Sequence, residues 1–237
     1  MSSLHAGQCK PRAGLASVVH GLVGMARPLD RDERDAALPK AGSVDELREL
    51  ATRCRACELW RNATQTVFGE GPSQARVLVV GEQPGNSEDL EGVPFVGPAG
   101  RLLDRALVDA GIDRNHVYVT NVVKHFKWRR APSGKRRIHA KPDSGEIAAC
   151  RPWLEAEVAR IRPELIVALG ATAAQALLGR SFRVTRQHGE VLDSDLGPTL
   201  ATIHPSAILR APDDARDAAY DGMVADLRAA AGHLARA

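Results

Sequence analysis

The 237-residue chain lacks any apolar run that approaches the roughly 18–20 residues of a membrane-spanning helix, and it lacks internal repeats. The sequence therefore predicts neither a membrane protein nor a repeat array. Cysteine is scarce, with four in all, and we interpret Cys54, Cys57 and Cys150 as metal ligands rather than disulfide partners. We therefore expect a cytoplasmic protein. No stripe of residues marks a subunit interface, so we expect a monomer.

Carboxylates are absent from one segment, residues 124–141, which reads KHFKWRRAPSGKRRIHAK. The segment holds eight Lys and Arg, whereas the chain holds 32 against 29 Asp and Glu, so the remainder has 24 against 29. The positive balance of the chain therefore comes from this segment. Together with Phe126 and Trp128, it suits a phosphate backbone and unstacked bases. Taken alone, the same pattern also fits a solvated basic loop.

Four short, apolar, β-branched runs predict strands that are buried on both faces, at residues 77–80, 117–120, 165–169 and 200–203. Helical patterns lie between and after them, at residues 101–110, 147–161, 171–178 and 213–235. Gly111 is placed to end the first of these helices. This alternation predicts an α/β fold, a three-layer α/β/α sandwich around a four-stranded parallel sheet.

The domain is predicted to span residues 43–237, after an N-terminal extension (1–42) whose structure the sequence specifies poorly. Its first element is a short helix, because Ser43 and Glu46 form a capping-box pattern that leads into the first cysteines.

Polar side chains follow three of the predicted strands. Glu82 and Gln83 come after the first strand in a Gly-Glu-Gln-Pro-Gly turn, Asn121 ends the second, and His204 follows the fourth. Ligands of open parallel sheets bind at the carboxyl ends of the strands. Each residue alone is weak evidence, but together they predict a site at one edge of the sheet.

Several motifs in order resemble the family 4 uracil-DNA glycosylases over residues 45–232. They are GEQPG with Glu88-Asp89, VPFVGPAGRLLDRAL, VYVTNVVK, ACRPWL and HPSAILR. The inserted residues 135–139, KRRIH, resemble the loop of the UdgX subfamily. That subfamily excises uracil and stays covalently attached to the DNA. The resemblance implies that the partner is uracil-containing DNA, and we expect a preference for single strands.

The resemblance also implies how a flipped uracil is read. Phe95 would stack on the base, and Asn121 would donate to O4 and accept from N3–H, a pattern that cytosine lacks. His204 would donate to O2 as negative charge gathers on the departing base. Gln83 and Gly85 would add backbone contacts to the base.

The remaining implied roles concern the sugar and the phosphates. Glu82 would stabilise a cationic, oxocarbenium-like sugar, as carboxylates do in glycosidases. Ser206 and Arg210 would hold phosphate, and the DNA backbone would be contacted by Lys135, Arg136 and Arg137. His139 would attack the sugar C1′ once uracil has left. On its own chemistry His139 fits a phosphate contact beside Arg136 and Arg137 better than the attack, and the match of all five residues of KRRIH reverses this preference.

The resemblance further implies a 4Fe-4S cluster, and the cysteines show one departure from the family. Cys54-x-x-Cys57 forms a ligand pair and Cys150 falls in the motif that supplies a further ligand, but His125 stands where the family has its remaining cysteine. Imidazole replaces thiolate on iron in Rieske centres. We therefore expect the ligands Cys54, Cys57, His125 and Cys150. Cys9 is the rival fourth ligand, and a zinc site or a set of unpaired buried thiols are the alternatives.

Three functions follow from these patterns. The first is uracil excision with covalent capture through His139. The second is an ordinary multi-turnover uracil-DNA glycosylase in which Glu82 activates water. The third is a non-catalytic binder of single-stranded nucleic acid with a structural metal site. The polar residues at three strand ends disfavour the third, and the KRRIH loop favours the first over the second.

Overall fold

Five strands form the main sheet of the computed structural model, which describes residues 27–134 and 136–236. Their order is β2 (Val117–Asn121), β1 (Val77–Gly81), β5 (Leu165–Leu169), β7 (Gly197–Thr202) and β6 (Val191–Ser194). The first four are parallel and correspond to the four predicted strands; β6 pairs with β7 in the antiparallel sense. The predicted α/β/α sandwich is confirmed, with one strand more than the four expected.

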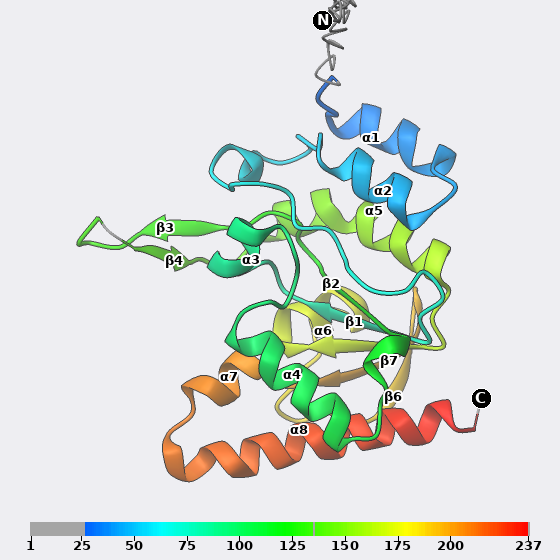
Figure 1. Ribbon diagram of the computed structural model, residues 1–237, viewed down its shortest axis with the longest axis vertical. Coiled ribbons are helices and arrows are strands. Elements are labelled where there is room, and N and C mark those ends of the chain that lie inside the picture. The colour runs from blue at the N-terminus through cyan, green and yellow to red at the C-terminus, as the bar shows by residue number, and fades with distance from the viewer. Residues whose placement is uncertain (1–26, 135, 237) are drawn as a thin grey trace, which may run out of the picture.

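Helices cover both faces of this sheet (Figure 1). One face carries α4 (Pro98–Asp109), α7 (Pro205–Arg210) and α8 (Asp213–Leu234), and the other carries α2 (Val44–Ala51), α5 (Ser144–Ile161) and α6 (Gly170–Leu178). Side chains alternate along β1, so Leu78 and Val80 pack toward α5 while Val77 and Val79 pack toward α4. Burying each of them stabilises the fold by about 1.5–3 kcal/mol.

Local sequence signals set the ends of these helices. Ser43 caps α2 by accepting the N–H of Glu46, while the Glu46 carboxylate accepts the N–H of Gly42 at 2.8 Å rather than that of Ser43. Gly111 has a φ of 77°, the left-handed conformation that ends a helix. The short elements are α3 (Asn86–Glu91), η2 (Glu58–Arg61) and η3 (Arg114–His116).

The chain before residue 43 adds two elements, α1 (Arg31–Ala37) and η1 (Leu38–Lys40). Arg34 of α1 is buried and donates to the backbone oxygen of Ala149 in α5. Leu29 forms a parallel bridge with Cys54. Residues 29–40 of the segment expected to be an extension therefore pack onto the domain, whereas residues 1–26, with Cys9, lie outside the described residues.

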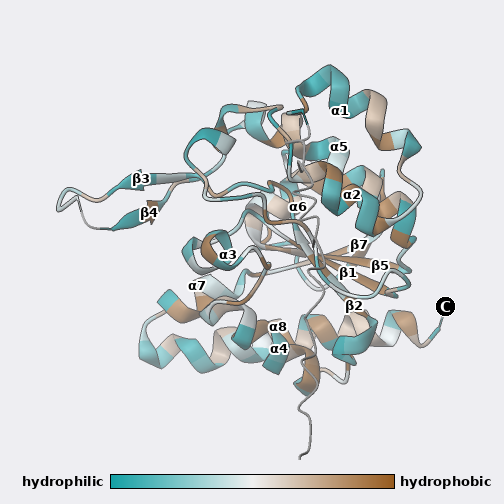
Figure 2. Ribbon diagram, turned by 45° about the horizontal axis from the view of Figure 1, so that its top comes forward, coloured by the Kyte–Doolittle hydropathy of each residue, from teal (hydrophilic) through white to brown (hydrophobic). Residues whose placement is uncertain are grey.

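The basic segment forms a hairpin of β3 (Trp128–Arg130) and β4 (Arg137–His139) that projects beside α3, away from the main sheet (Figure 1). Trp128 pairs with His139 and Arg130 with Arg137. The hairpin is largely hydrophilic, while the main sheet is the most uniformly hydrophobic part of the fold (Figure 2). Within residues 27–134 and 136–236, no helix combines the length and the apolar character needed to cross a membrane.

Candidate active site

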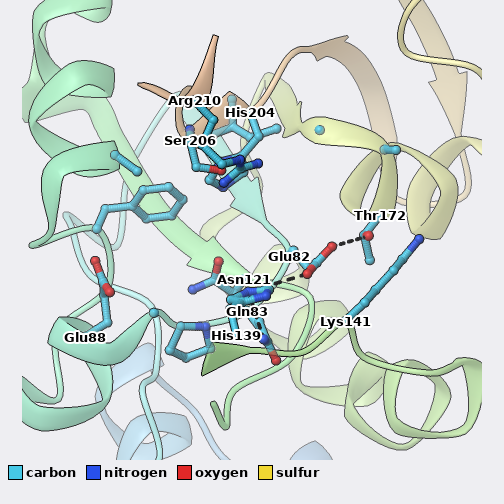
Figure 3. Close-up of a pocket in the computed structure, with 17 residues that line it drawn as sticks. Glu82, Gln83, Glu88, Asn121, His139, Lys141, Thr172, His204, Ser206 and Arg210 are labelled. Atoms are coloured by element: carbon cyan, nitrogen blue, oxygen red, sulfur yellow. Dashed lines mark hydrogen bonds and ion pairs between the residues drawn. The ribbon is translucent and has the colours of Figure 1, made fainter. Parts of the chain in front are cut away.

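A cleft of about 500 Å³ lies at the carboxyl edge of the parallel strands (Figure 3). The predicted residues that line it come from the ends of β1, β2 and β7, from β4 and α7, and from the turn before α4. They are Glu82, Gln83, Gly85, Phe95, Asn121, His139, His204, Ser206 and Arg210. The fold therefore brings together nine of the residues that the sequence predicted for the site.

Glu82 lies between two partners in this cleft (Figure 3). The hydroxyl of Thr172, at the start of α6, donates to Glu82 Oε2. The other oxygen, Oε1, lies 3.6 Å from His139 Nε2. The carboxylate is thus fixed on one side and faces an imidazole on the other.

Gln83 holds His139 beside the main chain. The Gln83 carbonyl oxygen accepts the N–H of Lys127 at 3.0 Å, which fixes the orientation of the amide. Its nitrogen, Nε2, therefore points to the backbone oxygens of Lys127 and Ala140 and to His139 Nε2, at 3.1, 3.0 and 2.8 Å. The amide has two protons for these three neighbours, and the two backbone oxygens can only accept, so Gln83 positions the His139 ring without setting which ring nitrogen carries the proton.

The pKa of His139 is lowered from its ordinary value, first because the cleft desolvates the ring and then because Arg210 repels the imidazolium, while Glu82 opposes the shift. About half of the side chain is exposed, 49%. The ring is therefore neutral at pH 7 and remains open to a ligand in the cleft.

The backbone sets the tautomer of His204. Its Nδ1 accepts the backbone N–H of Ser206 at 3.1 Å, so the proton of the neutral ring lies on Nε2. Burial above all, together with the positive Arg210 and with His139, lowers the pKa of His204 to about 4. At pH 7 His204 is a neutral hydrogen-bond donor.

Phe95 and Asn121 form the apolar and polar sides of the cleft. Phe95 adopts a φ of 58°, an uncommon conformation for an aromatic residue, and its ring lies 6.4 Å from that of His204 at an interplanar angle of 23°. Asn121 is buried at the end of β2. A Cβ on Gly81 would lie 2.4 Å from Asn121 Oδ1 and 2.8 Å from the Phe95 ring, so only glycine leaves room for both.

The three basic residues of the KRRIH loop differ in their surroundings. Lys135 lies outside the described residues, and Arg136 is exposed. Arg137 instead forms a 2.5 Å ion pair with the buried Asp89 and donates to Asn86 Oδ1 at 2.8 Å. Its guanidinium also lies over the ring of Trp128. In this structure Arg137 thus fastens the hairpin to α3.

The aromatic residues of the basic segment do not form an open stacking surface. Phe126 is only 1% exposed and packs inside the protein, so the expectation that it offers its ring to a base is wrong. Trp128 donates from its indole nitrogen to the backbone oxygen of Asn62 at 2.9 Å. Both rings instead pack against residues of β4. The Phe126 ring lies 6.0 Å from the His139 ring, and the Arg137 guanidinium lies over the Trp128 ring.

The predicted metal ligands lie among buried residues between α2, α5 and the end of β2. All three thiols are free. Burial, with a smaller contribution from neighbouring cysteines, raises the pKa of Cys57 and raises that of Cys150 to about 12. The sulfurs of Cys54 and Cys150 accept N–H groups from Trp153 and Lys124 at 3.3 and 3.2 Å. This donor set fits the chemistry of an iron–sulfur cluster, whose sulfurs take such hydrogen bonds.

The fourth predicted ligand has a different partner. His125 Nε2 lies 2.9 Å from the Thr66 hydroxyl, and burial lowers the pKa of His125 to about 4. Across residues 27–134 and 136–236, no three potential ligands are gathered around one point. The ligand set therefore stays a prediction.

Sequence reasoning missed three polar residues of the cleft, Thr172, Glu88 and Lys141. Thr172 follows β5, the one parallel strand whose carboxyl end the sequence analysis left unexamined. Glu88 is buried and accepts the N–H of Gly97 at 2.8 Å, which holds the turn that carries Phe95. A search of the residues that follow β5 could have identified Thr172. Glu88 was noted in the sequence only as part of a motif and was given no role in the site.

Comparison with known proteins defines the class first. Residues 68–228 match the uracil DNA glycosylase superfamily, and the chain belongs to that superfamily. More particularly, it is 41% identical over 172 residues to the type-4 uracil-DNA glycosylase of Thermotoga maritima, covering 70% of this chain and 85% of the relative. The type-4 enzyme of Pyrobaculum aerophilum is 37% identical, covering 71% and 86%. The type-5 uracil-DNA glycosylase of the same organism is 31% identical, covering 68% and 74%.

Proposed function

We propose that the protein excises uracil from DNA in the course of DNA repair and stays attached to the sugar C1′ through His139, as in the UdgX subfamily. The similarity to type-4 and type-5 uracil-DNA glycosylases supports excision. The single observation that carries the attachment is the position of His139: its Nε2 lies in the cleft, 3.6 Å from Glu82. An imidazole nucleophile thus stands beside the carboxylate that would stabilise the sugar cation.

In the proposed reaction, a uracil flipped into the cleft stacks on Phe95 and is read by Asn121. The glycosidic bond breaks with both electrons leaving on uracil, and the Nε2–H of His204 stabilises the charge on O2. Glu82 stabilises the cationic sugar. The His139 Nε2 pair then forms the bond to C1′. The proton on Nδ1 is released, and the departed uracil anion takes up a proton from water.

The adduct persists because imidazole is a poorer leaving group than uracil. A single event therefore consumes each protein molecule. The alternative is a multi-turnover glycosylase, and it is supported by the same Glu82, whose carboxylate Thr172 fixes where it could orient water. The two functions differ in the fate of the sugar, so one experiment separates them.

We further propose a 4Fe-4S cluster held by Cys54, Cys57, His125 and Cys150. The three free thiols, two of them buried, and the N–H groups that donate to the buried sulfurs of Cys54 and Cys150 support it. The cluster would supply structural cross-linking between α5, the segment after α2 and the base of the hairpin. DNA would be held by Lys135 and Arg136 on the hairpin and by Ser206 and Arg210 beside the cleft, with single strands preferred.

The test is a denaturing gel of the protein mixed with a uracil-containing single-stranded oligonucleotide and, separately, its thymine counterpart. We expect a uracil-dependent band that survives boiling in detergent. His139→Ala is expected to lose the band while still releasing uracil. His116→Ala is the matched control, because His116 is exposed in η3, before the amino end of β2, and should leave the band unchanged.

Two results would contradict the proposal. An undiminished band with His139→Ala would exclude His139 as the attachment point. Repeated release of uracil by wild-type protein without any band would favour the multi-turnover alternative.

A further inference from the structure

A buried ion pair lies under Asn121. Lys124, just after β2, is 1% exposed, and its partner Glu157 on α5 is fully buried. Neither residue lines the cleft. Removing two charges from water costs several kcal/mol per ion, and an apolar pair would often hold α5 on the sheet equally well. The choice of a charged pair therefore calls for a reason beyond stability.

The three protons of the Lys124 ammonium have three acceptors. Nζ donates to Thr120 Oγ1 at 2.5 Å, to the backbone oxygen of Asn121 at 2.8 Å and to the Glu157 carboxylate. Glu157 in turn accepts the hydroxyls of Tyr118 and Thr120 at 3.0 and 2.9 Å. The network is fully satisfied, which holds each member in one position.

The Asn121 carboxamide, in contrast, has no hydrogen-bond partner among residues 27–134 and 136–236. Its orientation toward a base therefore depends on how its backbone is held. Val122 N–H donates to the Gly81 oxygen at 2.9 Å, and the Asn121 oxygen is held by Lys124. Lys124 is thus the side chain that fixes the last peptide group of β2.

We propose that Lys124 is a positioning residue for base recognition, acting through Asn121. This inference rests on the proposed function, because it gives Asn121 the role of distinguishing uracil from cytosine. The same residue reaches α5 twice: its side chain pairs with Glu157, and its backbone N–H donates to Cys150 Sγ at 3.2 Å. The base-reading amide is thereby tied to the helix that carries a predicted cluster ligand.

The test compares wild-type protein with Lys124→Met/Glu157→Gln. This pair leaves no buried charge, and the Gln oxygen still accepts from Tyr118 and Thr120. The measured quantity is the ratio of dissociation constants for oligonucleotides that carry 2′-fluorinated cytidine or uridine, whose glycosidic bonds resist cleavage. We expect the double variant to lose about tenfold in this ratio, within the range that a bidentate base contact contributes.

A double-mutant cycle with Asn121→Ala separates positioning from general stability. If Lys124 acts through Asn121, the two substitutions leave the ratio of the Asn121→Ala protein unchanged. The control is Arg34→Met, which removes another buried contact to α5. Arg34 lies on α1 and its hydrogen bonds go to Asp35 and Ala149, so the binding of both oligonucleotides should weaken alike and the ratio should stay intact.

The outcomes can be told apart. A double variant that keeps the wild-type ratio, or that lowers it further in the Asn121→Ala protein, overturns the role of Lys124. Wild-type protein that neither prefers uridine nor releases uracil overturns the proposed function itself. Thermal unfolding of each variant, followed by circular dichroism, shows that the binding data come from folded protein.

Discussion

At the scale of single residues, two histidines in one cleft differ in their hydrogen-bond partners. His204 accepts a backbone N–H on Nδ1 and so offers its Nε2–H as a donor, whereas His139 Nε2 lies between the Gln83 amide and the Glu82 carboxylate. The sequence predicted that both histidines belong to the site. It could not predict the tautomer of His204, because this depends on the Ser206 N–H, whose position only the folded chain fixes.

The lowered pKa of His139 predicts how adduct formation depends on pH. A group with a pKa below its ordinary 6.5 is neutral, and hence nucleophilic, at and above pH 7. The rate should therefore be constant from about pH 7 to 8.5 and fall as the pH drops through the lowered pKa of His139. His204, with a pKa of about 4, stays neutral across this range.

The measurement is the single-turnover rate of adduct formation between pH 5 and 8.5. A midpoint above 6.5 would contradict the expectation, since it would mean that the ring is charged more readily than an ordinary histidine. Uracil release by His139→Ala serves as the control, because its rate should lack this midpoint.

At the scale of elements, the position of the hairpin depends on Arg137, whereas the neighbouring Arg136 is exposed. Arg137→Met removes the ion pair with Asp89 and should let β4 move, so adduct formation at saturating DNA is expected to fall about tenfold or more. Uracil release should persist, since Glu82, Asn121 and His204 stand on the main sheet. The two yields are measured on the same samples.

Arg136→Met is the matched control for this prediction. Losing one phosphate contact should weaken DNA binding and reduce its salt slope by about one, while leaving the adduct rate at saturating DNA unchanged. If both arginine variants changed only the binding constant, the fastening role of Arg137 would be refuted.

Periodicity and apolar runs were sufficient to predict the buried strands and the long helices. They missed β6, whose four residues Val191–Ser194 are an edge strand with no continuous apolar run. They also missed β3 and β4, since three-residue strands rich in arginine carry no strand signal. Phe126 was expected to be exposed because it lies in a basic run, yet its ring is buried in the folded protein. Contacts of this kind join residues that are far apart in the sequence, so a local sequence pattern does not predict them.

At the scale of the whole molecule, α5 connects the parts. It receives Arg34 from α1, pairs through Glu157 with the end of β2, and carries Cys150. If the proposed cluster joins Cys150 to His125, it closes the base of the basic hairpin. Anaerobically purified protein should then be brown and contain about four iron atoms per chain, the content of one such cluster.

Removing that iron should loosen the hairpin rather than unfold the sheet. Trypsin is expected to cut iron-free protein faster within residues 129–137, because the hairpin base loses its cross-link, while far-UV circular dichroism keeps its shape. The loop at residues 180–186 is the internal control: its three arginines are exposed near the opposite, β6 end of the sheet, so their cleavage rate should not change. Equally faster cleavage at both places would point to general unfolding. Unchanged cleavage at both places would show that the residues around Cys54, Cys57 and Cys150 hold the hairpin without metal.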